Sequence, residues 1–200
     1  MKKRIQLANN LFITVLTAAS VVSAQAAIHS YTVSFGPEAV GATGSGTGSV
    51  LYDDANHLLQ MQASFSGLSG TVTATHFHGP TTAPGTGTFG IAVGNPTLPN
   101  FPTGNNGNYS ETLDLTLSTV YNGGFLAGPG GGTAAGAESA FFTAMNEGRV
   151  YWNIHSSTFG SGEIRGFVTL VPEPSTIALA GVGIAAFAAR VWSKRRAKIS

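Results

Sequence analysis

Period-two alternation of apolar and polar side chains dominates the middle of this chain. Residues 57–65 read HLLQMQASF, with apolar side chains at every second position from Leu59 onward and polar ones between them. Residues 112–117 read TLDLTL and repeat the pattern. Such alternation is typical of antiparallel strands that bury one face. The pattern therefore predicts a β protein rather than a helical one.

The same criteria predict short strands along the whole body of the chain. They cover residues 31–35, 48–52, 57–65, 71–77, 89–93, 109–117, 149–155 and 163–170. One helix is predicted over residues 138–147, with Gly148 as its C-terminal stop. Residues 94–108 and 122–136 are rich in Gly, Pro and Asn and are predicted to be long loops. We expect an all-β fold, an antiparallel β-sandwich with Greek-key, Ig-like character and one short helix.

The N-terminal residues follow a different pattern. Three basic residues at positions 2–4 precede an apolar run at residues 11–22, and Ala24-Gln25-Ala26 is a small-residue cleavage site. This order is typical of a secretory signal peptide over residues 1–26. An uncleaved N-terminal anchor is the alternative, and the cleavage site disfavours it.

The C-terminal residues also predict a membrane segment. Residues 177–189 are apolar or small, and the basic residues of segment 194–198 follow. As a helix, residues 176–192 would span about 25 Å, slightly less than a hydrocarbon core of ~30 Å. We therefore expect a minimal transmembrane helix, with the basic ends in the cytoplasm and the body across the membrane.

Charge narrows the range of partners. Eight of the ten basic residues lie in the two terminal segments, so residues 27–170 carry two arginines against eight acidic residues, a formal charge of −6. Such a surface repels phosphate backbones, which excludes nucleic acid as a partner. The chain has no cysteine, so disulfides cannot stabilise the fold and thiolates cannot bind a metal ion. The body is long enough for one domain with a sizeable core.

A sorting signal is the first specific resemblance. Pro172-Glu173-Pro174, the apolar segment and the basic tail stand in that order, and residues 171–200 resemble a PEP-CTERM sorting signal. The resemblance implies recognition by an exosortase and a place in the cell envelope or extracellular matrix of a Gram-negative bacterium. It also implies transient anchoring in the inner membrane and association with exopolysaccharide.

Three short motifs carry the candidate chemistry of the body. They are HFHGP at residues 76–80, YWNIH at residues 151–155 and GEIRG at residues 162–166. Residues two apart on a strand share a face, so His76 and His78 point the same way. If the last two predicted strands pair with Asn153 opposite Arg165, cross-strand pairing also places His155 opposite Glu163. We therefore expect the side chains of four residues to share one surface: Asn153, His155, Glu163 and Arg165.

The three motifs together resemble the CHRD, or chordin-type, domain over residues 27–170. The resemblance implies a β-sandwich module with no established catalytic activity. No Gly-x-Ser-x-Gly elbow is present, and no serine nucleophile stands in a recognisable context. The sequence therefore predicts a non-enzymatic, exported module with a binding, adhesion or matrix role.

Two interpretations of the polar motif residues stay open. In the first, His76, His78 and His155 bind Zn²⁺ or Cu²⁺, with Glu163 as a fourth ligand or as the partner of a histidine. A His-x-His strand in a β-sandwich is similar to copper/zinc superoxide dismutase, so this alternative includes dismutase-like chemistry. In the second, no cofactor is bound, and the same residues form a polar network that sets strand register, with Arg165 bonded to a carboxylate or a backbone carbonyl.

Overall fold

The computed structural model describes residues 27–172, 183–188, 190 and 192. The predicted signal peptide and most of the predicted transmembrane segment lie outside these residues, as do Glu173 and Pro174 of the sorting motif. Among the helices of the described residues, none is both long enough and apolar enough to cross a membrane.

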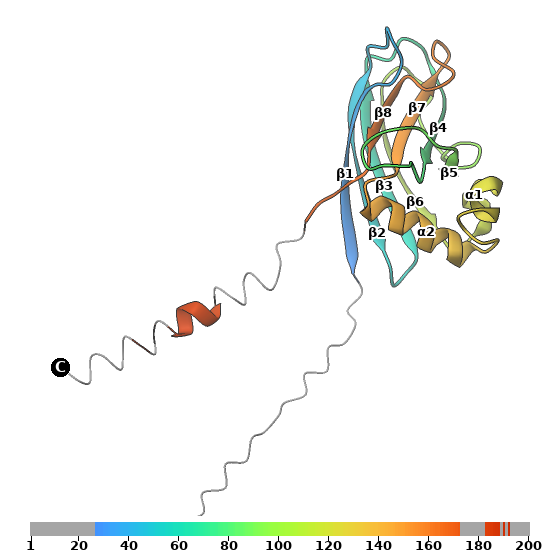
Figure 1. Cartoon of the computed structure of the whole chain (residues 1–200). Coiled ribbons are helices and arrows are strands. Elements are labelled where there is room, and N and C mark those ends of the chain that lie inside the picture. The colour runs from blue at the N-terminus through green and yellow to red at the C-terminus, as the bar shows by residue number, and fades with distance from the viewer. Residues whose placement is uncertain (1–26, 173–182, 189, 191, 193–200) are drawn as a thin grey trace, which may run out of the picture.

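The described chain forms one antiparallel sheet that curls round a core (Figure 1). The order across the sheet is β5-β4-β7-β8-β1-β2-β3-β6, and β9 pairs with β1. The strands are β1 (Ile28–Pro37), β2 (Ser45–Asp53), β3 (Leu58–Ser66), β4 (Val72–His78), β5 (Ile91–Val93), β6 (Gly107–Asp114), β7 (Tyr151–Ser156), β8 (Ile164–Phe167) and β9 (Thr169–Leu170). The predicted all-β, antiparallel fold is confirmed.

Strand β1 belongs to both walls of the sandwich. Most of its length pairs with β2, while Gly36 and Pro37 pair with Arg165 and Ile164 of β8. One wall therefore consists of β1, β2, β3 and β6, and the other of β5, β4, β7 and β8. The predicted hairpin of the last two strands is present, with Asn153 opposite Arg165.

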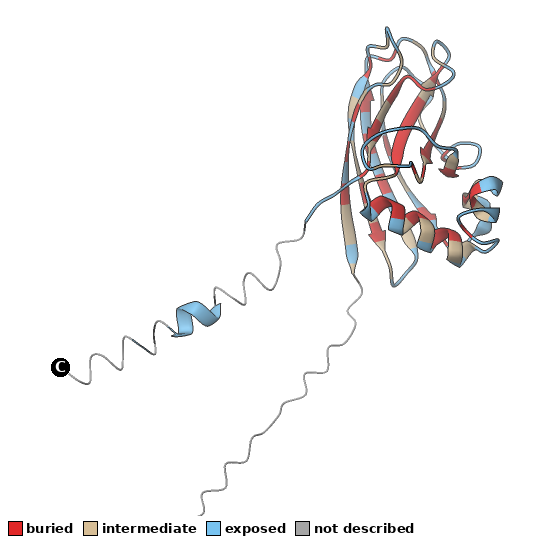
Figure 2. Cartoon of the chain, viewed as in Figure 1, coloured by how far each residue is buried: buried red, intermediate tan, exposed pale blue. Residues whose placement is uncertain are grey.

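The core lies between the two walls (Figure 2). Buried and more exposed residues alternate along β1, β2, β3 and β6, whereas β7 is buried almost throughout. Trp152 of β7 is at its centre, with the rings of Phe35 and Phe77 at 5.4 and 4.8 Å. Its indole Nε1 donates to Thr75 Oγ1 at 2.8 Å, so the polar end of this large side chain is satisfied inside the core. This bond also ties β7 to β4.

The helices differ from the prediction in extent. Helix α2 (Ala134–Asn146) begins four residues before the predicted start, because the side chain of Thr133 caps it by accepting from the Gly136 amide. It ends at Asn146, one residue before the predicted end, and Gly148 follows at a φ of 65°. The prediction of a continuous loop over residues 122–136 was wrong, because α1 (Gly123–Ala127) forms there, and a short 3₁₀ turn, η1 (Ser118–Val120), precedes it.

Helix α1 forms in a glycine-rich segment of low intrinsic helix propensity. The Asn122 side chain caps it by accepting from Gly124, and Phe125 is buried in the core. Capping and the burial of one aromatic side chain outweigh the unfavourable composition.

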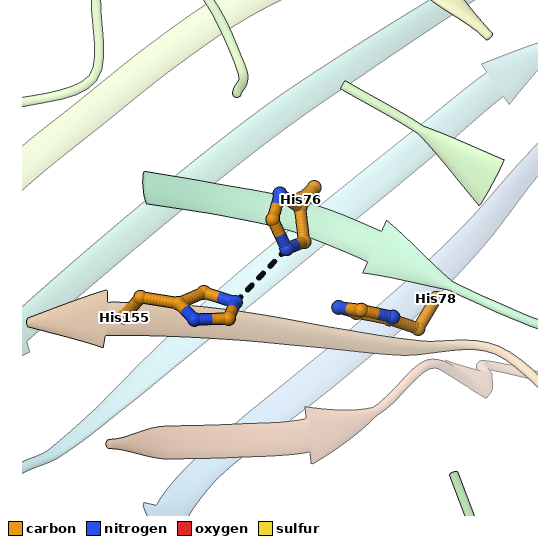
Figure 3. Close-up of side chains that lie close together, drawn as sticks. All are labelled: His76, His78 and His155. Carbon is orange, nitrogen blue, oxygen red and sulfur yellow. Dashed lines mark hydrogen bonds between the residues drawn. The ribbon is translucent and has the colours of Figure 1, made fainter. Parts of the chain in front are cut away.

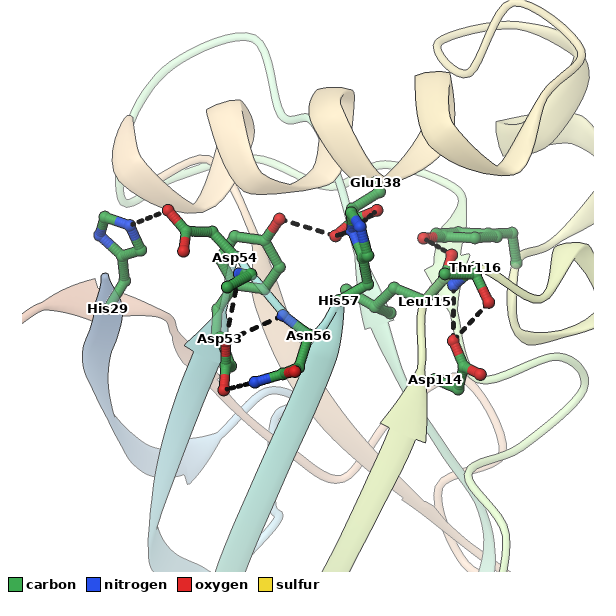
Figure 4. A network of polar contacts seen from close by, with 12 residues as sticks. His29, Asp53, Asp54, Asn56, His57, Asp114, Leu115, Thr116 and Glu138 are labelled. Atoms are coloured by element: carbon green, nitrogen blue, oxygen red, sulfur yellow. Dashed lines mark hydrogen bonds and ion pairs between the residues drawn. The ribbon is translucent and has the colours of Figure 1, made fainter. Parts of the chain in front are cut away.

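A buried carboxylate holds α2 against the sheet (Figure 4). Glu138 accepts a hydrogen bond from Tyr52 Oη at 2.7 Å, and His57 Nδ1 lies 3.0 Å from both of its oxygens. His57 follows the β2–β3 turn with a φ of 57°, a conformation that is uncommon outside glycine. The hydrogen bond and the negative charge of Glu138 raise the pKa of His57 above its ordinary value.

We expect Glu138→Gln to destabilise the protein more at pH 6 than at pH 9. A raised pKa means that the ion pair stabilises the fold below the unfolded-state pKa of His57, and that this contribution is lost as the pH rises through the folded-state value. Thermal unfolding at the two pH values measures the difference. Tyr52→Phe is the control, since it removes an uncharged donor and its effect should change little between them. If Glu138→Gln lowered the melting temperature equally at both pH values, the ion pair would be contradicted.

Close approach of β1 to β8 explains one glycine of the GEIRG motif. A Cβ at Gly166 would lie 2.7 Å from Val33 Cγ1 and would also collide with the Ser34 carbonyl oxygen. Only a residue without a side chain lets the two strands meet here.

We expect Gly166→Ala to lower the free energy of unfolding by about 1–3 kcal/mol, because it overpacks this crossing. The matched control is Gly36→Ala on β1, where an added Cβ meets no atom within 4 Å and the backbone is not left-handed. Chemical denaturation of both variants tests this, and equal stability of the two would show that the crossing tolerates a side chain.

Candidate metal centre

The pairing of β4 with β7 brings the three predicted histidines together. His76 and His78 lie on β4, opposite Asn153 and Tyr151 of β7, and His155 lies opposite Ala74. These residues share the face that points away from the core, because Phe77 and Trp152, which alternate with them, are fully buried. The site therefore sits on the outer side of the wall formed by β5, β4, β7 and β8.

Each imidazole is anchored through Nδ1 to a backbone carbonyl. The partners are Pro96 for His76 at 3.0 Å, Phe89 for His78 at 2.7 Å and Gly160 for His155 at 2.9 Å. A carbonyl oxygen can only accept, so each Nδ1 must carry the hydrogen. In the neutral form of each ring, Nε2 is then the atom with the free lone pair.

The free ring nitrogens converge (Figure 3). One nitrogen from each of the three histidines lies within 4.8 Å of the other two, and Nε2 of His155 is 2.9 Å from Nε2 of His76. Nε2 of His78 is buried and has no hydrogen-bond partner in the described part of the chain. Two neutral rings anchored in this way would face each other lone pair to lone pair, so the contact needs a cation between them, either a proton or a metal ion.

Burial favours neutral imidazoles at this site. His76 is only 4% exposed, and desolvation, with the nearby His78 and His155, lowers its pKa to about 4 against the opposing effect of the Pro96 carbonyl. Desolvation also lowers the pKa of His78, although the Phe89 carbonyl acts in the other direction. Neutral imidazole is the form that binds metal ions.

Asn153 supplies an oxygen beside the histidines. Its side chain is buried, Nδ2 donates to Glu38 Oε2 at 3.3 Å, and Oδ1 has no partner among the described residues. Asn153 Oδ1 is therefore available as a fourth donor or as the acceptor for a water molecule on an ion.

Arg165 lies at the edge of the site in a layered arrangement. The Tyr151 ring stacks on His78 with the centroids 4.8 Å apart and the planes 4° from parallel, and the Arg165 guanidinium lies 5.0 Å from the Tyr151 centroid. Arg165 also contacts Glu38 Oε1 at 3.4 Å and donates to the Gly87 carbonyl at 3.1 Å. These contacts restrict how the His78 ring can turn.

Glu163 does not take the place expected for it. It is fully buried, and its Oε1 accepts from the backbone amide of Ser69, while His155 bonds to the Gly160 carbonyl instead. Glu163 stands before the first residue of β8, next to Gly162 with a φ of 125°, so the regular alternation of the strand does not extend to it. The expected contact of His155 with Glu163 is absent, and the group of converging histidines does not include this carboxylate.

The three anchoring carbonyls were not found from the sequence. They come from loop residues, and every residue has a carbonyl, so no side-chain pattern indicates them. The one sequence feature that points to them is that Gly/Pro-rich segments, which contain Phe89 and Pro96, follow HFHGP closely in the chain.

Comparison with known families agrees with the three motifs. A family model of the CHRD domain matches residues 11–168, and a model of the PEP-CTERM protein-sorting motif matches residues 170–196. The chain therefore belongs to the CHRD domain family and carries an exosortase-sorting signal, which makes it a secreted, envelope-associated surface protein. None of the curated proteins and none of the solved structures compared with it matches.

Proposed function

We propose that the CHRD domain of this sorted protein binds one divalent metal ion through His76, His78 and His155. The observation that carries the proposal is that every Nδ1 is anchored to a carbonyl, which leaves each Nε2 lone pair free, while one nitrogen of each ring lies within 4.8 Å of the other two. Histidine ligands in metalloproteins characteristically donate their other ring N–H in this way. A polar network without an ion would have to keep a proton between the half-buried ring of His155 and the buried ring of His76, whose pKa is lowered to about 4.

Binding requires only small movements of the rings. With metal–nitrogen bonds of ~2.0–2.1 Å, tetrahedral ligand nitrogens lie about 3.3 Å apart. The closest pair, at 2.9 Å, would open slightly, and the widest, at no more than 4.8 Å, would close by up to about 1.5 Å. Closing this gap would give the buried Nε2 of His78 a partner.

Zinc and copper are the ions that suit this donor set. Three imidazoles bind both, and no thiolate is present to favour a softer ion. Asn153 Oδ1 or a water molecule would complete the coordination. Copper would make the site redox-active, which is the requirement for dismutase-like chemistry, whereas zinc would not.

We expect the full chain, purified from the envelope, to contain about one equivalent of zinc or copper by elemental analysis. Removal of the ion should lower the melting temperature, and returning it should restore stability by about 2.7 kcal/mol at a metal concentration of 100 Kd. His76→Ala and His155→Ala should lose both the metal and the stabilisation.

The control for these variants is His29→Gln. His29 lies on β1, 3.8 Å from Asp54, and belongs to no converging group of ligand atoms among the residues that the structure describes, so this variant should keep its metal. Circular dichroism identifies any variant that fails to fold. Folded wild-type protein that contains no metal and is not stabilised by added zinc or copper would overturn the proposal.

We also infer that the exported domain acts as a non-enzymatic binding or adhesion module of the cell envelope or matrix. The sorting signal, the −6 charge of residues 27–170 and the lack of a recognisable nucleophile support this role. The inferred route is export by the N-terminal signal peptide of a Gram-negative bacterium, transient anchoring in the inner membrane through residues 176–192, and recognition by an exosortase.

We expect replacement of Pro172, Glu173 and Pro174 by alanine to stop sorting at the membrane. The variant should accumulate as the longer form in the inner-membrane fraction, because the motif that the exosortase recognises is gone while export is unchanged. Immunoblots of fractionated cells measure this, with Thr169→Ala just outside the motif as the control. Accumulation of the wild type in the cytoplasm would contradict the export route itself.

A further inference from the structure

The outer face of the wall formed by β1, β2, β3 and β6 carries an unusual set of side chains. The positions that point away from the core are exposed or half-buried and are occupied mainly by hydroxyl and amide residues. They include Ser30, Thr32, Ser34, Ser45, Thr47, Ser49, Gln60, Gln62, Ser64, Ser66, Asn108, Ser110 and Thr112. We call this set the polar face.

Strand register arranges these side chains in rows across the wall. One row runs Thr32–Ser49–Gln62–Ser110, and the next runs Ser34–Thr47–Ser64–Asn108. Thr169 of β9, opposite Thr32, extends the first row. With strands ~4.8 Å apart and same-face residues about 6.6–6.8 Å apart along a strand, the two rows form a regular lattice of short polar groups.

The two rows contain no ionisable side chain. The acidic residues of this wall that point outward, Asp53 and Asp114, lie at the strand ends that face helix α2 (Figure 4). Hydroxyl and amide groups both donate and accept hydrogen bonds. The polar face therefore suits a ligand that also presents hydroxyl groups and carries no charge.

Two open depressions mark this face. One, of ≈ 480 Å³, lies over β2, β3 and β6, and the other, of ≈ 350 Å³, lies over β1, β2 and β3. Thr47 and Ser64 line both. No residue of the opposite wall lines either depression, so both open outward from the core.

We propose that the polar face binds a neutral, polyhydroxylated polymer, that is, an uncharged polysaccharide. This inference rests on the proposed role as an exported binding module and names its partner. A protein partner would be expected to meet aromatic, Met or Arg anchors, and the two rows have none. An acidic polysaccharide or a phosphate-bearing lipid would need cations, which the rows also lack.

The same chemistry limits the strength of each contact. Without an aromatic ring in the rows, no sugar ring can stack, and each neutral hydrogen bond contributes only about 0.5–1.5 kcal/mol net. Single sugars therefore bind weakly, and retention depends on many repeats of one chain engaging the lattice together. The polar face therefore binds a polymer more strongly than its monomers, because only the polymer makes many such contacts at once.

The experiment uses the full-length protein and the extracellular polysaccharide of the bacterium that makes it, separated by anion exchange into neutral and acidic fractions. Affinity electrophoresis should show retardation by the neutral fraction and not by the acidic one, and hydrolysis of the neutral fraction to monosaccharides should abolish it. Ser64→Glu, which puts a charge where the two depressions meet, should weaken retardation at least tenfold, while Ser64→Thr should retain it.

Ser139→Glu, on the exposed side of α2, is the control for added charge and should behave as the wild type. Retardation by the acidic fraction alone, or equal retardation of wild type and Ser64→Glu, would overturn the inference. So would the absence of any retardation in a correctly exported protein, which leaves the export role intact. Metal content, measured on the same samples, reports on the metal proposal independently.

Discussion

The register between β4 and β7 is the constraint on which the core and the candidate site both depend. It places Phe77 opposite Trp152 on the inner side and His76 opposite Asn153 on the outer side. A shift by one residue would exchange the faces of a strand, burying the imidazoles and exposing the aromatic rings. The bond from Trp152 Nε1 to Thr75 Oγ1, and from Thr75 Oγ1 to the Asn153 carbonyl, acts against such a shift. Stability and site geometry are therefore set by the same contacts.

Backbone carbonyls of the loops orient the histidine side chains that the strands bring together. The carbonyls of Pro96, Phe89 and Gly160 orient three rings that come from only two strands. Because these carbonyls belong to separate connecting segments, the site is built from five parts of the chain. Its geometry would respond to changes in loops that contribute no side chain to it.

The sequence predicted the strands and the histidine group for clear physical reasons. Alternation identifies a half-buried strand, and His-x-His on such a strand necessarily shares one face. Tyr-x-Asn-x-His does the same on the strand of His155. The pairing of these two strands, which brings the three histidines together, was not predicted from the sequence. Glu163 was misplaced because the regular alternation was extended to the residue before β8, where the chain has just left the left-handed Gly162. Helix α1 was missed because the glycine-rich composition of the segment predicted a loop. In the folded chain, capping by Asn122 and burial of Phe125 in the core stabilise the helix despite this composition.

The last strand ends almost where the sorting motif begins. The Val171 amide still donates to the Ser30 carbonyl at 2.8 Å, and Pro172 is the next residue. The folded domain thus has a tether of nearly zero length, whereas a flexible linker of n residues would give it a reach of about 5–6 Å × √n. An exosortase that recognises this motif must work directly against the folded sheet or first detach the two-residue β9.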